Sequence, residues 1–403
     1  MLQLLEEAAA EDIDALAERF CSGAVYPAGR DIHDLAVDVH SRFVTKSALI
    51  PRYWPSVRKL EAEVVSMAAD LLGGETVLGN VTSGGTESIL LGVKIARDRG
   101  LARRPDLDKP EMVVPKTAHP AFWKGAEYFG LRVVAIDLAP NDALDIDAYR
   151  RAVNHRTVLL VGSAPNVFTG AVDPVEDLAA LARQHDVSLH VDACIGGFFL
   201  PFARRMGYAV PSFDFGVSGV TTMSADLHKF GYVATKGASV ILSRDPEIYA
   251  FQSFQFGPPD RKPGWFTTPT LAGTRTGGGI AAAWAVMRYL GEEGYLARAR
   301  TVMDMVQRVR DRVARIDGLS IIGAPAMSVF ALAAEGFDIF AAAGALEAKG
   351  WLLKRDTWPR PLIRFMQSPG HAPHVERFLD DLEVACADAR GRRSSADGDV
   401  AYV

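Results

Sequence analysis

The middle of the chain alternates short apolar runs with amphipathic segments of helical period, and this alternation restricts the fold more than any other feature. The apolar runs predict β-strands at residues 112–114, 131–136, 157–162, 187–191, 219–223 and 238–242. Residues 174–185 predict one of the intervening helices, with Asp173 as its N-cap and Pro174 at its first position. Strands that are separated by helices imply crossover connections. We therefore expect an α/β fold with a large, mainly parallel sheet.

The pattern changes near residue 279. A long helical stretch to about residue 316 precedes four short apolar runs and one further helix, at residues 319–322, 328–332, 351–354, 362–366 and 337–349. These elements predict a smaller C-terminal α+β domain over residues 279–390, after a large domain over residues 56–278. Residues 1–55 are expected to form an N-terminal segment that begins with an amphipathic helix. Residues 391–403 are expected to be a flexible tail, because they have little apolar surface to bury.

Charge and cysteine content exclude several classes of function. The 403 residues carry 44 basic and 49 acidic side chains, a net charge of -5, so no basic surplus indicates nucleic-acid or anionic-membrane binding. Cys21, Cys194 and Cys386 have neither metal-site spacing nor an even number for disulfides. The apolar stretch 278–290 is shorter than the roughly 20 residues that span a bilayer. We expect a cytoplasmic protein with no transmembrane segment and no metal site, acting on a small molecule.

The sequence TSGGTE at residues 82–87 places two glycines directly before a predicted helix. Gly84 and Gly85 would let backbone N–H groups converge on an anion, and the helix dipole would add to the attraction. A plain glycine turn capped by Thr or Ser fits the motif equally well, because short glycine motifs are weak signals.

Three further polar side chains follow predicted strands, where parallel sheets bind their ligands. They are His119, Asp192 and Lys229, and each taken singly also fits an ordinary core, capping or surface residue. Together with the glycine motif they describe one pocket. It has an anion cradle, an imidazole to stack on a flat ring, an acid for a ring nitrogen and an amine able to form a Schiff base. These are the requirements of pyridoxal phosphate (PLP).

The surrounding sequence resembles the fold-type I, group II decarboxylase family of PLP enzymes, and within it the sphingosine-1-phosphate lyases. The most specific blocks are HVDACIGGF at residues 190–198 and SADLHKFGY at residues 224–232, and further matches extend over nearly the whole chain. The resemblance implies a mainly parallel sheet of the seven-stranded type, PLP as cofactor and a homodimer with shared active sites. It also implies the soluble bacterial type rather than the eukaryotic type with a membrane helix.

The resemblance also implies a role for each motif residue. Lys229 would hold the cofactor as a Schiff base, Asp192 would pair with the pyridine nitrogen and His119 would stack on the ring. The remaining cofactor-binding residues would be Gly84, Gly85, Thr86, Ser163, Asn166 and His228, with Gly273 and Thr274 reaching the neighbouring subunit's cofactor.

The implied reaction is retro-aldol cleavage of a 2-amino-3-hydroxy substrate, such as a sphingoid base phosphate, to an aldehyde and an amine. The family's substrate-phosphate donors are only partly present. Tyr26 is kept, whereas Ile50 and Phe266 stand where a His and a Tyr are typical. Lys236 lies one residue further from Lys229 than the usual Lys. The loss of these donors would weaken binding of the substrate phosphate unless Arg52, Arg261 or Lys262 substitutes.

Arg364 supports an alternative function. It resembles the Arg by which group II amino-acid decarboxylases hold a substrate carboxylate, although an Arg on a surface strand is an equally ordinary interpretation. A carboxylate clamp would favour an amino-acid decarboxylase on the same scaffold. An aminotransferase fits the Lys229 and Asp192 blocks less well. A scaffold without activity is disfavoured, because every residue that the chemistry needs is present.

Overall fold

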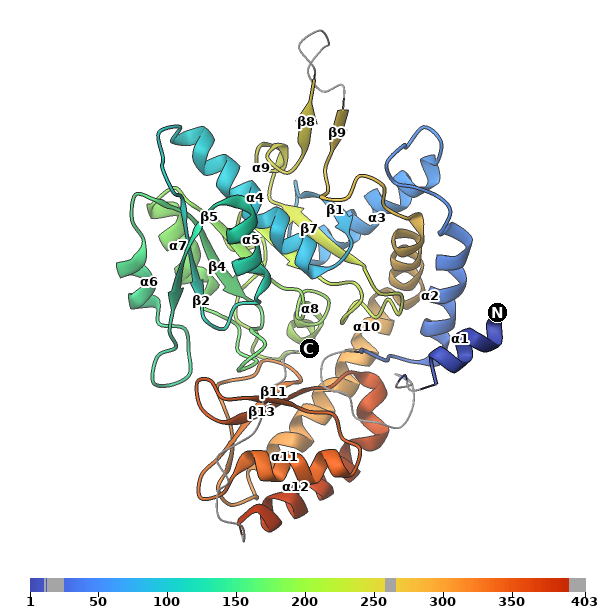
Figure 1. Ribbon diagram of the computed structural model, residues 1–403, viewed down its shortest axis with the longest axis vertical. Coiled ribbons are helices and arrows are strands. Elements are labelled where there is room, and N and C mark those ends of the chain that lie inside the picture. Colours follow the sequence, from blue (N-terminus) through green and yellow to red (C-terminus); the bar gives the residue numbers. More distant parts are fainter. Residues whose placement is uncertain (11, 13–24, 258–265, 391–403) are drawn as a thin grey trace.

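The computed structural model describes residues 1–10, 12, 25–257 and 266–390, and its centre is a seven-stranded sheet (Figure 1). The strand order is β1-β7-β6-β5-β4-β2-β3. Strand β7 is antiparallel to both of its neighbours, and the other six strands are parallel to one another. The predicted fold class is therefore confirmed. The strands are β1 (Leu78–Thr82), β2 (Glu111–Pro115), β3 (Arg132–Ile136), β4 (Thr157–Ser163), β5 (Ser188–Asp192), β6 (Thr222–Ala225) and β7 (Ser239–Ser243).

Helices cover both faces of this sheet. Alternate residues of a strand point to opposite faces, and in β2 the side chains of Met112 and Val114 join a different apolar cluster from that of Val113. The cluster of Met112 and Val114 contains residues of α4 and α5, and the cluster of Val113 contains residues of α6 and α7. The helices of this domain are α4 (Gly85–Arg103), α5 (Ala121–Phe129), α6 (Ile146–Ala152), α7 (Val175–Gln184), α8 (Leu200–Arg205) and α9 (Pro246–Ala250).

A long helix, α10 (Gly277–Val313), leads from the large domain into a smaller one (Figure 1). Gly291, with φ 52° and ψ -169°, interrupts its helical geometry. The smaller domain has an antiparallel sheet in the order β10-β11-β13-β12, with α11 and α12 beside it (Figure 1). Its elements are β10 (Leu319–Ile321), β11 (Val329–Ala334), α11 (Ile339–Ala348), β12 (Lys354–Asp356), β13 (Leu362–Met366), η1 (Pro369–His374) and α12 (Val375–Arg390).

The remaining elements lie before β1 and between β7 and α10. Helices α2 (Arg30–Phe43) and α3 (Pro55–Leu71) pack against α10, and α1 (Leu2–Ala8) begins the chain. The hairpin of β8 (Phe254–Phe256) and β9 (Phe266–Thr268) projects from the body of the molecule (Figure 1). No helix in the described ranges is both long enough and apolar enough to cross a membrane.

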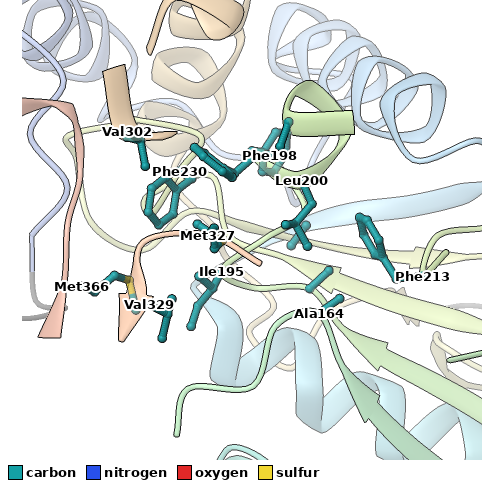
Figure 2. Close-up of a cluster of buried hydrophobic side chains, with 14 of the residues drawn as sticks. Ala164, Ile195, Phe198, Leu200, Phe213, Phe230, Val302, Met327, Val329 and Met366 are labelled. Carbon is teal, nitrogen blue, oxygen red and sulfur yellow. The ribbon is translucent and has the colours of Figure 1, made fainter. Parts of the chain in front are cut away.

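An apolar cluster fixes the small domain against the large one. Figure 2 shows Ile195 and Phe230 of the large domain beside Met327, Val329 and Met366 of the small domain. All five side chains are buried. Burial of each such side chain stabilises the fold by about 1.5–3 kcal/mol. The two domains therefore pack against each other through a shared apolar core, and residues of both can line a single cavity.

Several local predictions differ from the structure. Helix α7 begins at Val175, and Asp173 does not cap it, because its Oδ2 accepts a hydrogen bond from the Ser163 N–H at 2.7 Å. Strands β6 and β12 lie about three residues later than predicted, and β1 was not predicted. The expected flexible tail at residues 391–403 lies outside the described residues, as do residues 11 and 13–24 of the N-terminal segment.

Candidate active site

The predicted motifs converge at the carboxyl edge of the parallel strands. The glycine motif follows β1, His119 follows β2, Asp192 ends β5 and Lys229 follows β6. Two cavities of about 330 and 360 Å³ lie here, and both are lined by His119, Cys194 and Lys229. The first continues past Asp192 to the small domain, and the second contains the glycine motif. The sequence therefore brings an amine, an acid and an anion cradle to one place.

The second cavity is shaped for an anion at the start of α4. Gly84 has a φ of 146°, which side-chain-bearing residues rarely adopt. A Cβ at Gly85 would lie 2.8 Å from both carboxylate oxygens of Asp226 and 2.9 Å from Cys194 Sγ, so only glycine fits. Glu87 fixes the loop, because its carboxylate accepts hydrogen bonds from the backbone N–H groups of Ser83 (2.6 Å) and Leu271 (2.9 Å). The positive end of the helix dipole favours an anion here.

Lys229 is held by Asp226, a residue whose role was not predicted from the sequence. Its Nζ lies 2.9 Å from Oδ2 of Asp226, and the Asp226 side chain is 1% exposed. Burial alone would lower the pKa of Lys229, but Asp226 and the neighbouring Tyr26 raise it above the usual range. The pKa of Asp226 is lowered, because the charges of Lys229 and His228 outweigh its burial. The sequence does place this acid three residues before Lys229, a spacing that could have indicated the pair.

One carboxylate oxygen of Asp192 accepts hydrogen bonds from the protein, and the other can accept one from a ligand. Its Oδ1 accepts hydrogen bonds from the Cys194 N–H (3.0 Å) and from Ser224 Oγ (3.1 Å). Ser224 lies in turn 3.2 Å from Nε2 of the buried His190, whose Nδ1 lies 2.9 Å from Thr222 Oγ1. Neither of these two hydrogen bonds to Asp192 uses Oδ2. This oxygen is suited to a protonated ring nitrogen.

Two histidines flank Lys229. His119 accepts a hydrogen bond at Nδ1 from the Ala121 N–H (3.1 Å), and burial lowers its pKa, so the neutral ring carries its proton at Nε2. His228 donates from Nδ1 to the Ala238 carbonyl (2.6 Å), and burial lowers its pKa as well. Its ring lies beside the position that a Cβ at Gly84 would take, 3.8 Å away. His119 lies at the junction of the two cavities, and His228 lies in the anion cradle.

Of the other predicted cofactor residues, three line one of the two cavities and two line neither. Thr86 lines the second cavity, and Ser163 and Asn166 line the first. The Asn166 amide is engaged with its own loop, because it accepts from the N–H groups of residues 168 and 169 and donates to the carbonyl of residue 171. Gly273 and Thr274 follow β9 and line neither cavity.

The predicted substrate residues are also separated. Tyr26 lines the first cavity and a third cavity of about 430 Å³, which contains Lys236 and His228. Arg52 is exposed and lines none of these three cavities. The other two candidate donors, Arg261 and Lys262, lie outside the described residues.

Arg364 is a buried residue of the first cavity, so its interpretation as a surface residue is wrong. Its side chain is 9% exposed, and its Nε forms an ion pair with Asp356. The guanidinium also donates to the Val167 carbonyl at 3.2 Å and lies 4.5 Å from the centre of the Phe168 ring. A carboxylate of the same chain therefore already balances this charge.

Comparisons with known proteins agree with this geometry. Residues 18–332 match the family described as the pyridoxal-dependent decarboxylase conserved domain. The chain is 40% identical over 372 residues to the sphingosine-1-phosphate lyase of Oryza sativa subsp. japonica, covering 90% of this chain and 68% of that protein. It is 34% identical over 352 residues to the probable L-tyrosine/L-aspartate decarboxylase of Methanothermobacter thermautotrophicus, covering 87% and 94%. A solved structure of the Burkholderia pseudomallei sphingosine-1-phosphate lyase has a TM-score of 0.92 and 35% identity, covering 97% and 90%.

The residues present fit PLP. The open oxygen of Asp192 suits its pyridine nitrogen, and the buried amine of Lys229 suits its aldehyde. The cavity at the start of α4, lined by residues 84–86 and His228, suits its phosphate. The chain therefore belongs to the pyridoxal-dependent decarboxylase family, as a PLP-dependent lyase that resembles the sphingosine-1-phosphate lyases.

Proposed function

We propose that the chain cleaves a phosphorylated 2-amino-3-hydroxy compound, such as a sphingoid base phosphate, to an aldehyde and a phosphorylated amine. The observation that carries this proposal is the position of Lys229, between an anion cradle and a cavity that continues to the small domain. The similarity to the Oryza and Burkholderia lyases supports the same reaction. When bound, PLP supplies an electron sink for the electron pair of the broken carbon–carbon bond.

Each site residue has a task in this reaction. Lys229 would hold the cofactor covalently through its Nζ. When free, this Nζ would lie beside Asp226, accept the proton that the substrate 3-hydroxyl group gives up and return a proton to the product carbon. Asp192 Oδ2 holds the proton on the ring nitrogen, and His119 stacks on the ring. The backbone of residues 84–86 and His228 hold the cofactor phosphate.

A homodimer completes the proposal. Gly273 and Thr274 lie outside the three cavities of their own chain, which suits residues that reach a neighbouring active site. Arg52 is exposed, and we assign it the same role toward a neighbouring subunit. Cytoplasmic location is proposed from the cysteines, since Cys194 and Cys386 are buried free thiols.

An amino-acid decarboxylase is the second candidate function, supported by the 34% identity to the Methanothermobacter protein. Its main requirement is a cation free to bind the substrate carboxylate. Arg364 lies in the right cavity, but the Asp356 carboxylate already pairs with it. This pairing argues against Arg364 as the carboxylate clamp.

A product assay separates the two functions. The PLP-loaded enzyme is incubated with sphinganine 1-phosphate or with L-tyrosine, L-aspartate and L-glutamate, and both aldehyde and carbon dioxide are measured. We expect aldehyde from the phosphorylated amino alcohol and no carbon dioxide from the amino acids. Carbon dioxide without aldehyde would establish the decarboxylase instead.

A further inference from the structure

The small domain presents a second cation to the first cavity. In the antiparallel pair of β12 and β13, Lys354 lies directly opposite Arg364. Residues that are paired in this way project from the same face of a sheet, and so do residues two apart, such as Lys354 and Asp356. Lys354 and Arg364 both line the first cavity, which contains Lys229 at its other end. Lys354 is exposed, which places it at the mouth.

The two cations differ in how their charge is balanced. Arg364 forms an ion pair with Asp356, donates to the Val167 carbonyl and lies over the Phe168 ring. Among the described residues, no carboxylate forms an ion pair with Lys354. The three charged side chains of this wall therefore carry one net positive charge, and Lys354 is the group that can turn toward a ligand.

The electrostatic surroundings of Lys354 agree with a position in the substrate cavity. Partial desolvation, the charge of Arg364 and the charge of Lys229 lower the pKa of Lys354, and Asp356 acts in the opposite direction. Lys354 therefore lies within the electrostatic reach of the amine that binds the cofactor. An anionic ligand between them would be attracted by both cations.

Among the described residues, Tyr26 is the one kept family donor for a substrate phosphate that lines this cavity. Ile50 and Phe266, which stand at the His and Tyr positions, are 43% and 41% exposed and line none of the three cavities. Lys236 lies in the third cavity, on the other side of Tyr26. Apart from Lys229, the permanent cations of the first cavity's described lining are Lys354 and Arg364.

We propose that Lys354 binds the phosphate monoester of the substrate and offsets the donors that this chain lacks. Arg364, fixed by Asp356, acts as a positioning residue that keeps the wall in place and adds to its positive potential. The inference deepens the proposed lyase function and rests on it for the identity of the anion. An ammonium suits this site, because its three donors rotate to meet a phosphate that enters from the mouth.

The first test measures steady-state kinetics of the PLP-loaded enzyme with sphinganine 1-phosphate. Lys354→Met keeps most of the side-chain volume and removes the charge. We expect KM to rise roughly tenfold to a hundredfold, the range for loss of one charge-assisted hydrogen bond, with kcat changed far less. Lys354→Arg should restore most of the affinity. Lys349→Met is the matched control, because Lys349 belongs to the same domain, pairs with Asp381 and lines none of the three cavities.

The second test measures binding without turnover. Inorganic phosphate and phosphoethanolamine are titrated into the PLP-loaded enzyme by calorimetry. Both should bind the Lys349→Met enzyme like the wild type and bind the Lys354→Met enzyme at least several-fold more weakly.

The outcomes separate the inference from the proposed function. If the wild type cleaves sphinganine 1-phosphate but Lys354→Met has an unchanged KM and unchanged phosphate binding, the role of Lys354 is refuted and the lyase stands. If Lys354→Met instead raises KM for an amino acid alone, Lys354 binds the substrate carboxylate and its assignment to the phosphate is wrong. If the wild type cleaves no phosphorylated amino alcohol, the lyase proposal fails, and calorimetry still decides whether Lys354 binds phosphate.

Discussion

The ammonium of Lys229 lies 2.9 Å from Asp226 Oδ2, and this carboxylate is almost completely buried. Its second oxygen, Oδ1, has no hydrogen-bond partner within the described structure. A buried charge is costly unless it is paired, so the pair fixes both groups at the floor of the cofactor cavity. The proton of Lys229 is accordingly held firmly, and its pKa is raised.

Asp226→Asn should weaken this hold on the proton. In the PLP-loaded enzyme, we expect the pH midpoint of the bound cofactor's absorbance change to fall by about one to three pH units, because a negative neighbour has been removed. The measurement is an absorbance titration, with the urea unfolding curve recorded alongside. Asp98→Asn is the control, because it removes the partner of Lys94 at the same 2.9 Å distance on α4, away from these cavities. An unchanged midpoint in a folded Asp226→Asn enzyme would exclude the role.

Lys229→Ala tests the covalent attachment of the cofactor. The glycine cradle and Asp192 remain, so the variant should still bind PLP, but more weakly. It should lack the absorbance band of the covalently bound cofactor, and borohydride should attach no cofactor to it. Multiple turnovers should also be lost. A Lys229→Ala enzyme that keeps both the band and turnover would contradict the assignment, and Lys124→Ala on the exposed side of α5 provides the comparison.

Asp192→Asn tests the charge at the ring nitrogen. Asn can still accept the hydrogen bonds of Cys194 and Ser224, so the fold should be retained. A neutral partner no longer holds the ring nitrogen protonated, and the loss of a charge-assisted pair should lower kcat roughly tenfold to a hundredfold or more. Unfolding curves that match the wild type, together with this lower kcat, would agree with the prediction. A kcat near the wild-type value would contradict it.

The convergence of the chemical motifs could be predicted from the sequence, because the carboxyl ends of parallel strands meet at one edge of a sheet. His119, Asp192 and Lys229 each follow a predicted strand, so the inexact bounds of those strands did not affect their placement. The glycine motif follows β1, which was not predicted. The role of Asp226 could also have been predicted. Asp226 lies on the same turn as Lys229. Its burial could not be predicted from the sequence, because burial depends on tertiary packing.

Contacts between distant segments could not be predicted in this way. Asp173 precedes a helix and looks like its N-cap, yet it bonds to Ser163 at the end of a neighbouring strand. Strand β12 has only three residues, and its register against β13 decides that Lys354 and Asp356 share a face with Arg364. An apolar run cannot specify such a register, because the pairing depends on the loop and on the core below it.

The buried His190 should make stability depend on pH. Burial lowers its pKa to about 4, from an ordinary value near 6.5 in the unfolded chain. Between pH 6.5 and 4 the unfolded chain therefore binds a proton that the folded chain does not, and stability falls with the pH. This residue alone should account for about 3 kcal/mol over that window.

The measurement is urea unfolding between pH 7 and 4. His190→Gln should show a smaller loss of unfolding free energy over this range than the wild type, because the titrating group is absent. His155→Gln, at an exposed position, should follow the wild type. Equal slopes for His190→Gln and the wild type would show that His190 does not titrate in this way.

The pair of Asp356 and Arg364 should act as a buried unit rather than as a ligand clamp. Both side chains are less than a tenth exposed, so removal of the acid alone would leave the buried Arg364 without the charge of Asp356. Asp356→Asn should therefore lower the free energy of unfolding by about 3–5 kcal/mol, whereas Asp356→Leu combined with Arg364→Met should cost much less. Glu347→Gln is the control, because it removes the partner of the neighbouring Arg355 at a more exposed site. If the double variant were as unstable as Asp356→Asn, the pair would not act as a unit. A free carboxylate clamp at Arg364 would instead leave stability almost unchanged in Asp356→Asn and tighten the binding of amino acids.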